Sequence, residues 1–256
     1  GAGAGAVGGE HRGAGMTTAT WTPLEARVWD ALGTVCDPEL DQPITDLGFV
    51  AEASVRGEGS PECTVLVRLR LPTYFCAPNF AYLMVADAHD AVRAAARVSA
   101  VEVRLEDHFA AEEINAGVSS QAGFAGAFPR HAGGELAELR LIFQRKAHLA
   151  CLERACRRLL KDGWQIEALA QAQLSDLPDS PERESLLRRR SGLGLPTHPG
   201  AHLFVDDDGE PVPAEDLPAR LRFAQAVRVS VDGNAHYCRG LLETRYGTRI
   251  PEKDGP

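Results

Sequence analysis

Hydrophobic and polar residues follow two different periods in the first part of the chain. Strict alternation indicates strands, whereas hydrophobic residues at every third or fourth position indicate helices. The expected elements are a helix over residues 23–35, strands over 48–56 and 62–71, a helix over 79–97 and a strand over 101–106. The order helix, strand, strand, helix, strand predicts a small two-layer α+β domain, which we place at residues 21–109.

The second half of the chain has a different pattern. No period survives over residues 110–134, which are rich in Gly, Ala and Ser and are expected to form a linker or a long loop. Residues 135–256 are then expected to form a mainly helical C-terminal module of unknown role with a short hairpin. Its expected elements are a long helix over residues 135–161, a short helix from Ser180, a hairpin over 202–212 and two helices over 213–229 and 235–246. Residues 1–20 are excluded from this division, as an extension that is either disordered or an artefact of expression.

Composition and charge restrict the kind of partner. The formal net charge of −9 argues against a nucleic-acid partner bound through its phosphates, and the run Arg188-Arg189-Arg190 is expected to be a solvated helix face. No segment is apolar enough for a membrane span, and no secretory signal is seen near the first residues. The six cysteines follow no disulfide spacing, which favours reduced thiols and a cytoplasmic location.

Cys76 is the most promising reactive group. It lies in the loop Pro72-Thr73-Tyr74-Phe75-Cys76-Ala77-Pro78, between a predicted strand and a predicted helix. A thiol at a helix N-terminus is favoured as a thiolate, which is a nucleophile or a metal ligand. Catalysis by this nucleophile would require a general base, and the nearest histidines in the sequence, His89 and His108, have no fixed relation to it. An enzyme is therefore the least favoured interpretation.

Three separated motifs resemble one known family. They are Asp37-Pro38-Glu39, then Ile44-Thr45-Asp46-Leu47-Gly48-Phe49-Val50, and finally Pro72-Thr73-Tyr74 followed by Cys76. In this order they resemble the PaaD-like and SufT-like domains of iron-sulfur cluster assembly, over about residues 23–108. The resemblance implies an accessory factor for the maturation of iron-sulfur or di-iron proteins. PaaD-like members accompany bacterial di-iron oxygenases, so the implied client is an iron protein such as a subunit of a multicomponent oxygenase.

The resemblance also implies a site. Cys76 would contact iron, a cluster or transferred sulfur, with Asp37, Glu39, Asp46 and Thr73 as further candidates. The alternative for the acidic residues is that Asp37 and Asp46 cap turns and Glu39 is a surface charge, while Thr73 shapes the loop. One thiolate does not complete a four-coordinate site, so a second protomer, a client or small thiols would supply the rest. This predicts either transient binding of the cargo or a homodimer.

A second candidate metal site lies in the C-terminal half. His148 and Cys151 are three residues apart on the long predicted helix and can share a face. His236 and Cys238 could join them from another helix to give ligands suited to zinc or iron. The alternative is ordinary packing and solvent exposure.

Two classes of function therefore remain open besides the enzyme. The first is a maturation factor that delivers iron, sulfur or a cluster. The second is a metal-free chaperone or binding module that docks on an oxygenase subunit. The metal content of protein purified without air would discriminate between them.

Overall fold

The computed structural model describes residues 21–121, 123–128 and 133–247, so the expectation for residues 1–20 lies outside the described part. The first half contains, in order, α1 (Pro23–Leu32), β1 (Val50–Arg56), β2 (Thr64–Arg70), α2 (Pro78–Ala95) and β3 (Ala100–Glu106). This is the predicted order, and the α+β fold class is confirmed.

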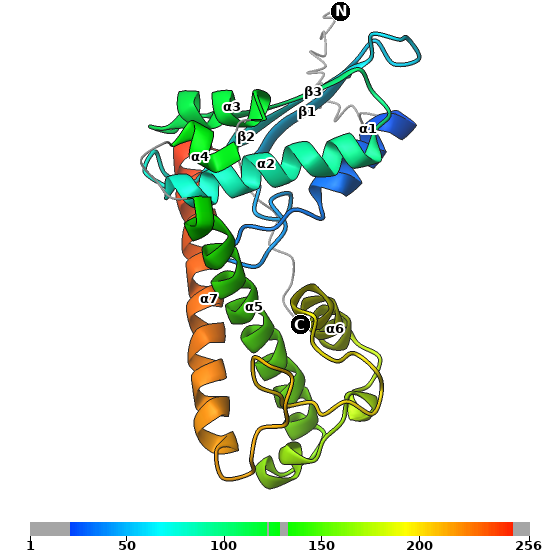
Figure 1. Ribbon diagram of the computed structural model, residues 1–256, viewed down its shortest axis with the longest axis vertical. Helices are drawn as coiled ribbons and strands as arrows, with labels where there is room; N and C mark the ends of the chain where they lie inside the picture. The colour runs from blue at the N-terminus through cyan, green and yellow to red at the C-terminus, as the bar shows by residue number, and fades with distance from the viewer. Residues whose placement is uncertain (1–20, 122, 129–132, 248–256) are drawn as a thin grey trace, which may run out of the picture.

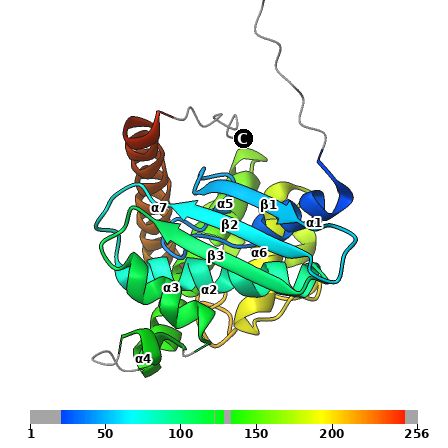
Figure 2. The same cartoon turned by 90° about the horizontal axis from the view of Figure 1, so that it is seen from above.

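The three strands form one sheet in the order β1-β2-β3, with β1 antiparallel and β3 parallel to the central strand (Figure 2). Alternate residues of β2, namely Val65, Val67 and Leu69, are buried, and α1 and α2 cover this face (Figures 1 and 2). The other face is polar, and Arg68 pairs there with Glu106 at 3.2 Å. The alternation in the sequence thus separates a core face from a solvent face.

The two helices of this domain begin where the sequence signals indicate. At α1, the Oγ1 of Thr22 accepts a hydrogen bond from the N–H of Glu25 at 3.2 Å, and the Glu25 carboxylate accepts one from the N–H of Thr22 at 2.9 Å. This capping box satisfies backbone donors that have no partner within the helix. At α2, Pro78 occupies the first helical position, where its missing N–H costs no hydrogen bond.

The segment expected to be a linker or long loop contains two helices, α3 (Ala111–Ser119) and α4 (Gly123–Ala127). A Cβ built at Gly117 would lie 2.4 Å from the Cβ of Ala127, so the close approach of these helices requires glycine at position 117. The expectation of an irregular segment is therefore corrected. Small residues without a period are typical of loops, whereas here they let two short helices touch.

The C-terminal half is mainly helical, as predicted. Its elements are α5 (Gly133–Lys161), the 3-10 turns η1 (Ile166–Ala170) and η2 (Leu174–Asp176), α6 (Pro181–Leu193) and α7 (Leu217–Tyr246). Figure 1 shows α5 and α7 side by side, extending away from the sheet, with α6 against α5. The expected hairpin is reduced to a single bridge between Val205 and Pro211. None of the helices within the described ranges is both long and apolar enough to span a bilayer.

Residues 217–246 form one continuous helix, so the prediction of two helices over this region is wrong. The expected break lies around Gly233, where a Cβ would meet nothing within 4 Å. The neighbouring Asp232 is bound by Arg154 of α5 at 2.6 Å and by Arg228 of α7 at 2.8 Å. Packing of α7 on α5 thus keeps the helix continuous through residues of weak helical propensity.

The arginine run in α6 is also not the solvated face that we expected. Arg188 is exposed, but Arg189 is half-buried and pairs with Asp41. Arg190 is fully buried and donates hydrogen bonds to the carbonyl oxygens of Pro196, at 3.1 Å, and His202, at 3.0 Å. A buried guanidinium holds several loop carbonyls at once because it carries five N–H donors in a planar arrangement.

Candidate functional site

Cys76 lies in the loop between β2 and α2, directly before Ala77, the N-cap residue of α2. This confirms the expected position at a helix N-terminus. The thiol is partly exposed, and its Sγ lies 3.3 Å from the Oγ1 of Thr73. The same Oγ1 accepts a hydrogen bond from the N–H of Phe75 at 3.2 Å, which holds the hydroxyl beside the sulfur. Thr73 thus shapes the loop and contacts the thiol.

His108 forms a hydrogen bond with the backbone of this loop. Its Nδ1 accepts a hydrogen bond from the N–H of Ala110 at 3.2 Å, so its Nε2 donates to the carbonyl oxygen of Cys76 at 2.7 Å. The imidazole is buried, and burial lowers its pKa, with a smaller lowering from the positive charge of Arg245. His108 is therefore a neutral anchor for Cys76, and its contact is with the peptide rather than with the thiol.

Aromatic side chains surround the loop on its solvent side. Tyr74, Phe75 and Phe109 contact one another, and Phe75 has 77% of its surface exposed. An apolar cavity of about 410 Å³ adjoins them, with Pro78 and Phe124 among its lining residues. We call Tyr74, Phe75 and Phe109 the aromatic rim. Exposed aromatic residues grouped in this way are typical of protein interaction sites.

The acidic motif residues lie on the loop formed by residues 36–47, which we call the acidic loop. The Oδ1 of Asp37 accepts hydrogen bonds from the N–H groups of Glu39 and Leu40, both at 2.8 Å. Burial raises the pKa of Asp37 to about 6 against the lowering effect of these two bonds. This geometry matches the turn-capping alternative for Asp37. Asp46 is half-buried in the same loop.

The helix α7 brings a further cysteine to this region. Cys238 is partly buried and packs against the N-terminal core, as Cys76 does. Burial is the main cause that raises the pKa of Cys238 to about 11, with smaller contributions from the negative charges of Asp37, Cys76 and Glu39. The sequence offers Cys238 only as a candidate for the second site, because nothing in one sequence shows which face of a long helix meets which domain.

The residues of that second candidate site are not brought together. His148 is buried, and burial together with Arg190 lowers its pKa to about 4. Cys151 is buried, and burial raises its pKa to about 11, whereas His236 is exposed on α7. Across residues 21–121, 123–128 and 133–247, no group of three or more His, Cys, Asp or Glu side chains is arranged to hold a metal ion.

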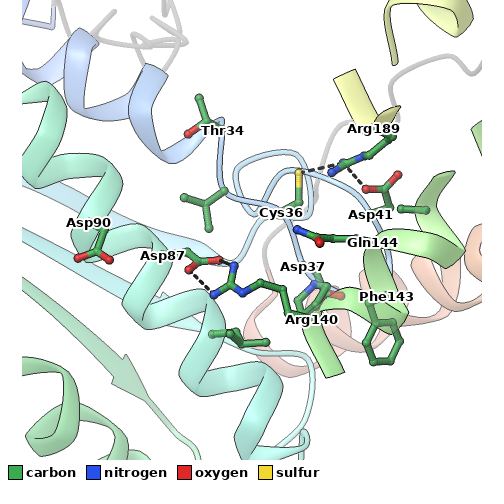
Figure 3. A pocket seen from close by; sticks show the side chains of 14 residues that line it. Thr34, Cys36, Asp37, Asp41, Asp87, Asp90, Arg140, Phe143, Gln144 and Arg189 are labelled. Carbon is green, nitrogen blue, oxygen red and sulfur yellow. Dashed lines mark hydrogen bonds and ion pairs between the residues drawn. The ribbon is translucent and has the colours of Figure 1, made fainter. Parts of the chain in front are cut away.

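A polar cavity of about 340 Å³ lies between the two halves of the chain, and sequence reasoning missed it (Figure 3). Arg140 of α5 reaches across to Asp87 of α2 with two hydrogen bonds of 2.8 Å. Opposite, Arg189 of α6 donates to the Sγ of Cys36 at 3.6 Å and pairs with Asp41 of the acidic loop. These pairs join α5 and α6 to the N-terminal domain, and their charges are satisfied within the chain.

Comparison with known proteins identifies the first domain. Residues 25–104, about a third of the chain, match the model of a family described as iron-sulfur cluster assembly protein. The resemblance noted from the sequence motifs is confirmed over these residues. No curated protein and no solved structure matches the chain. Residues 25–104 therefore match an iron-sulfur cluster assembly domain, and the remaining residues have no counterpart among these comparisons.

Proposed function

We propose that this chain is an accessory factor that hands iron, a cluster or sulfur to a client protein through Cys76. The assembly domain supports a role in iron-sulfur cluster maturation. The role of Cys76 is supported by its position, because it is a partly exposed thiol at a helix N-terminus within that domain. Such a thiol is accessible to a partner, and a cysteine sulfur is a suitable ligand for iron.

The residues around Cys76 fit a cargo that is held briefly. A thiolate is a suitable ligand for iron, but one thiolate leaves most of a four-coordinate site unfilled. Asp37 uses its Oδ1 for the turn, and Glu39 accepts a hydrogen bond from Asn234 at 3.4 Å. The remaining ligands must come from elsewhere, and incomplete coordination makes release to a client easier. Iron is therefore cargo in this proposal and not a resident cofactor.

The expected client is an iron protein, and the PaaD-like resemblance favours a subunit of a bacterial di-iron oxygenase. The neighbouring genes should identify the client. The chain and the apo form of this client are purified without air, and the chain is loaded with iron. The assay measures the iron content of the client after incubation with the loaded chain.

The test of the metal contact is anaerobic reconstitution with ferrous iron and sulfide. Cys76→Ser should take up clearly less iron and sulfide than the wild-type protein. Cys63→Ala is the matched control, because it removes a thiol elsewhere in the same domain. Cys63 is buried directly before β2. Undiminished uptake by Cys76→Ser would refute the role of Cys76 as the contact.

The aromatic rim favours a second candidate function, a metal-free chaperone. Its three rings are exposed next to the Cys76 loop and offer an apolar surface to a client. In this case Phe75→Ser should abolish client activation while Cys76→Ser leaves it intact. The reverse result favours delivery of cargo.

A further inference from the structure

Cys238 lies on the face of α7 that is turned toward the N-terminal domain. Residues 235, 238 and 242 are spaced by three and four positions and therefore share one helical face. Ala235 and Leu242 are buried in the N-terminal core, with 1% and 2% of their surfaces exposed. Cys238, one turn from each, packs against the same core. The orientation of this thiol is thus set by its buried neighbours.

Contacts on both sides of Cys238 fix the position of α7 along the domain. Before it, the Nδ2 of Asn234 donates to Glu39 at 3.4 Å. After it, Arg245 donates to the carbonyl oxygen of Leu71 at 3.1 Å and to that of Asp107 at 2.6 Å. Cys238 therefore lies on the stretch of α7 between its contact with the acidic loop and its contact with the start of the Cys76 loop.

The segments held by Arg245 are the two that frame Cys76. Leu71 begins the Cys76 loop, and Asp107 precedes His108, which binds the Cys76 carbonyl oxygen. The N–H of Phe109 also donates to the carbonyl oxygen of Tyr74 at 3.1 Å. The end of α7 thus clamps the framework of the Cys76 loop.

We infer that Cys76 and Cys238 form a two-thiol site, built jointly by the assembly domain and α7, that binds a thiophilic metal ion such as iron as cargo. This inference rests on the proposed function and deepens it. It supplies a second thiolate from the same chain, where the sequence suggested a second protomer. No further His, Asp or Glu completes a metal-binding group with these thiols in the described part of the chain. Two positions of a four-coordinate ion are left for a client or for small thiols.

Cadmium titration without air tests the site directly, because thiolate-to-cadmium absorbance reports the number of sulfur ligands. The wild-type protein should show the absorbance of two thiolates for the cadmium bound here. Cys238→Ser should lose about half of this absorbance and bind at least about tenfold more weakly, since even a residue that only supports a ligand is worth roughly that factor. Cys76→Ser should do the same, and the double variant should lose the band. Cys63→Ala is again the control.

The outcomes separate the two proposals. If Cys238→Ser keeps the wild-type absorbance and affinity while Cys76→Ser loses them, the two-thiol site is refuted and the Cys76 contact stands. If both variants behave as the wild type, both proposals fail. Loss in both variants, with unchanged thermal unfolding, supports the two-thiol site.

A second measurement needs no variant. Dibromobimane joins two thiolates that lie close together, because each sulfur displaces one bromide to form a carbon–sulfur bond. Digestion of the folded, treated protein should yield a bridged pair of peptides containing Cys76 and Cys238, with two bromides released for each bridge. A product in which Cys76 is labelled alone and Cys238 is unmodified would contradict the inference.

Discussion

Replacing Asp37 with asparagine should stabilise the protein at neutral pH. The carboxylate has only 7% of its surface exposed, and its Oδ1 accepts hydrogen bonds from two backbone N–H groups of the acidic loop. An asparagine Oδ1 can accept the same two bonds. The variant therefore keeps the turn and removes a charge that is costly to bury.

The size of the effect follows from the pKa of Asp37, which burial raises from 3.8 to about 6. Because the native state binds this proton more tightly than the unfolded state, native stability falls as the pH rises from about 3.8 through about 6. The full shift corresponds to about 3 kcal/mol at pH values near 7.5 and to about 1 kcal/mol near 4.5. The advantage of Asp37→Asn over the wild type should thus grow by about 2 kcal/mol between these two pH values.

Urea unfolding of both proteins at the two pH values measures this difference, and other titrating groups cancel in the comparison. Asp30→Asn, on the exposed side of α1, removes the same charge and should change stability by no more than about 0.5 kcal/mol. A gap between Asp37→Asn and wild type that does not widen with pH would refute the reasoning. Iron uptake by the same variant separates two roles: unchanged uptake assigns Asp37 to the turn, and reduced uptake assigns it to the cargo site.

Three further predictions concern stability. Burial and Arg190 lower the pKa of His148 to about 4, so the wild type should lose stability as the pH falls below about 6.5, by about 2 kcal/mol at pH near 5. Urea unfolding should show that His148→Leu lacks this loss, and an equal slope would contradict the assignment. Arg190→Met leaves three loop carbonyls without their donor and should cost at least about 3 kcal/mol, measured by thermal unfolding; an unchanged midpoint would mean that other donors replace it. Gly117→Ala should cost about 1–3 kcal/mol because its methyl group meets Ala127, and Ala127→Gly in the same chain should restore part of the loss.

Local patterns were sufficient for the N-terminal domain. The alternation in β2 and the capping signals at Thr22 and Pro78 depend on residues that are close together in the chain, so they can be predicted from the sequence. The position of Cys76 before a helix follows from the same signals. The family resemblance, confirmed over residues 25–104, rests on motifs in this domain.

Long-range packing decided the features that the sequence did not reveal. The continuity of α7 depends on Asp232 and its partners on two helices, and the burial of Arg190 depends on carbonyl oxygens of the loop that follows α6, 6 to 13 positions away. His108 became an anchor for Cys76 although the two are 32 positions apart. The packing of Cys238 against the N-terminal core escapes prediction for the same reason. Spacing along one helix shows which residues share a face, but it does not show what that face meets.

The C-terminal half packs against the N-terminal domain and forms hydrogen bonds with it. The family match ends at residue 104, yet Asn234 and Arg245 of α7 donate hydrogen bonds to Glu39 and Leu71 within the matched residues. Removal of α7 would expose the part of the N-terminal core that Ala235 and Leu242 now cover. It would also remove Cys238, which packs against the same core. The framework of the Cys76 loop therefore depends on the whole chain, and the tests of the proposed iron contact should use the whole chain.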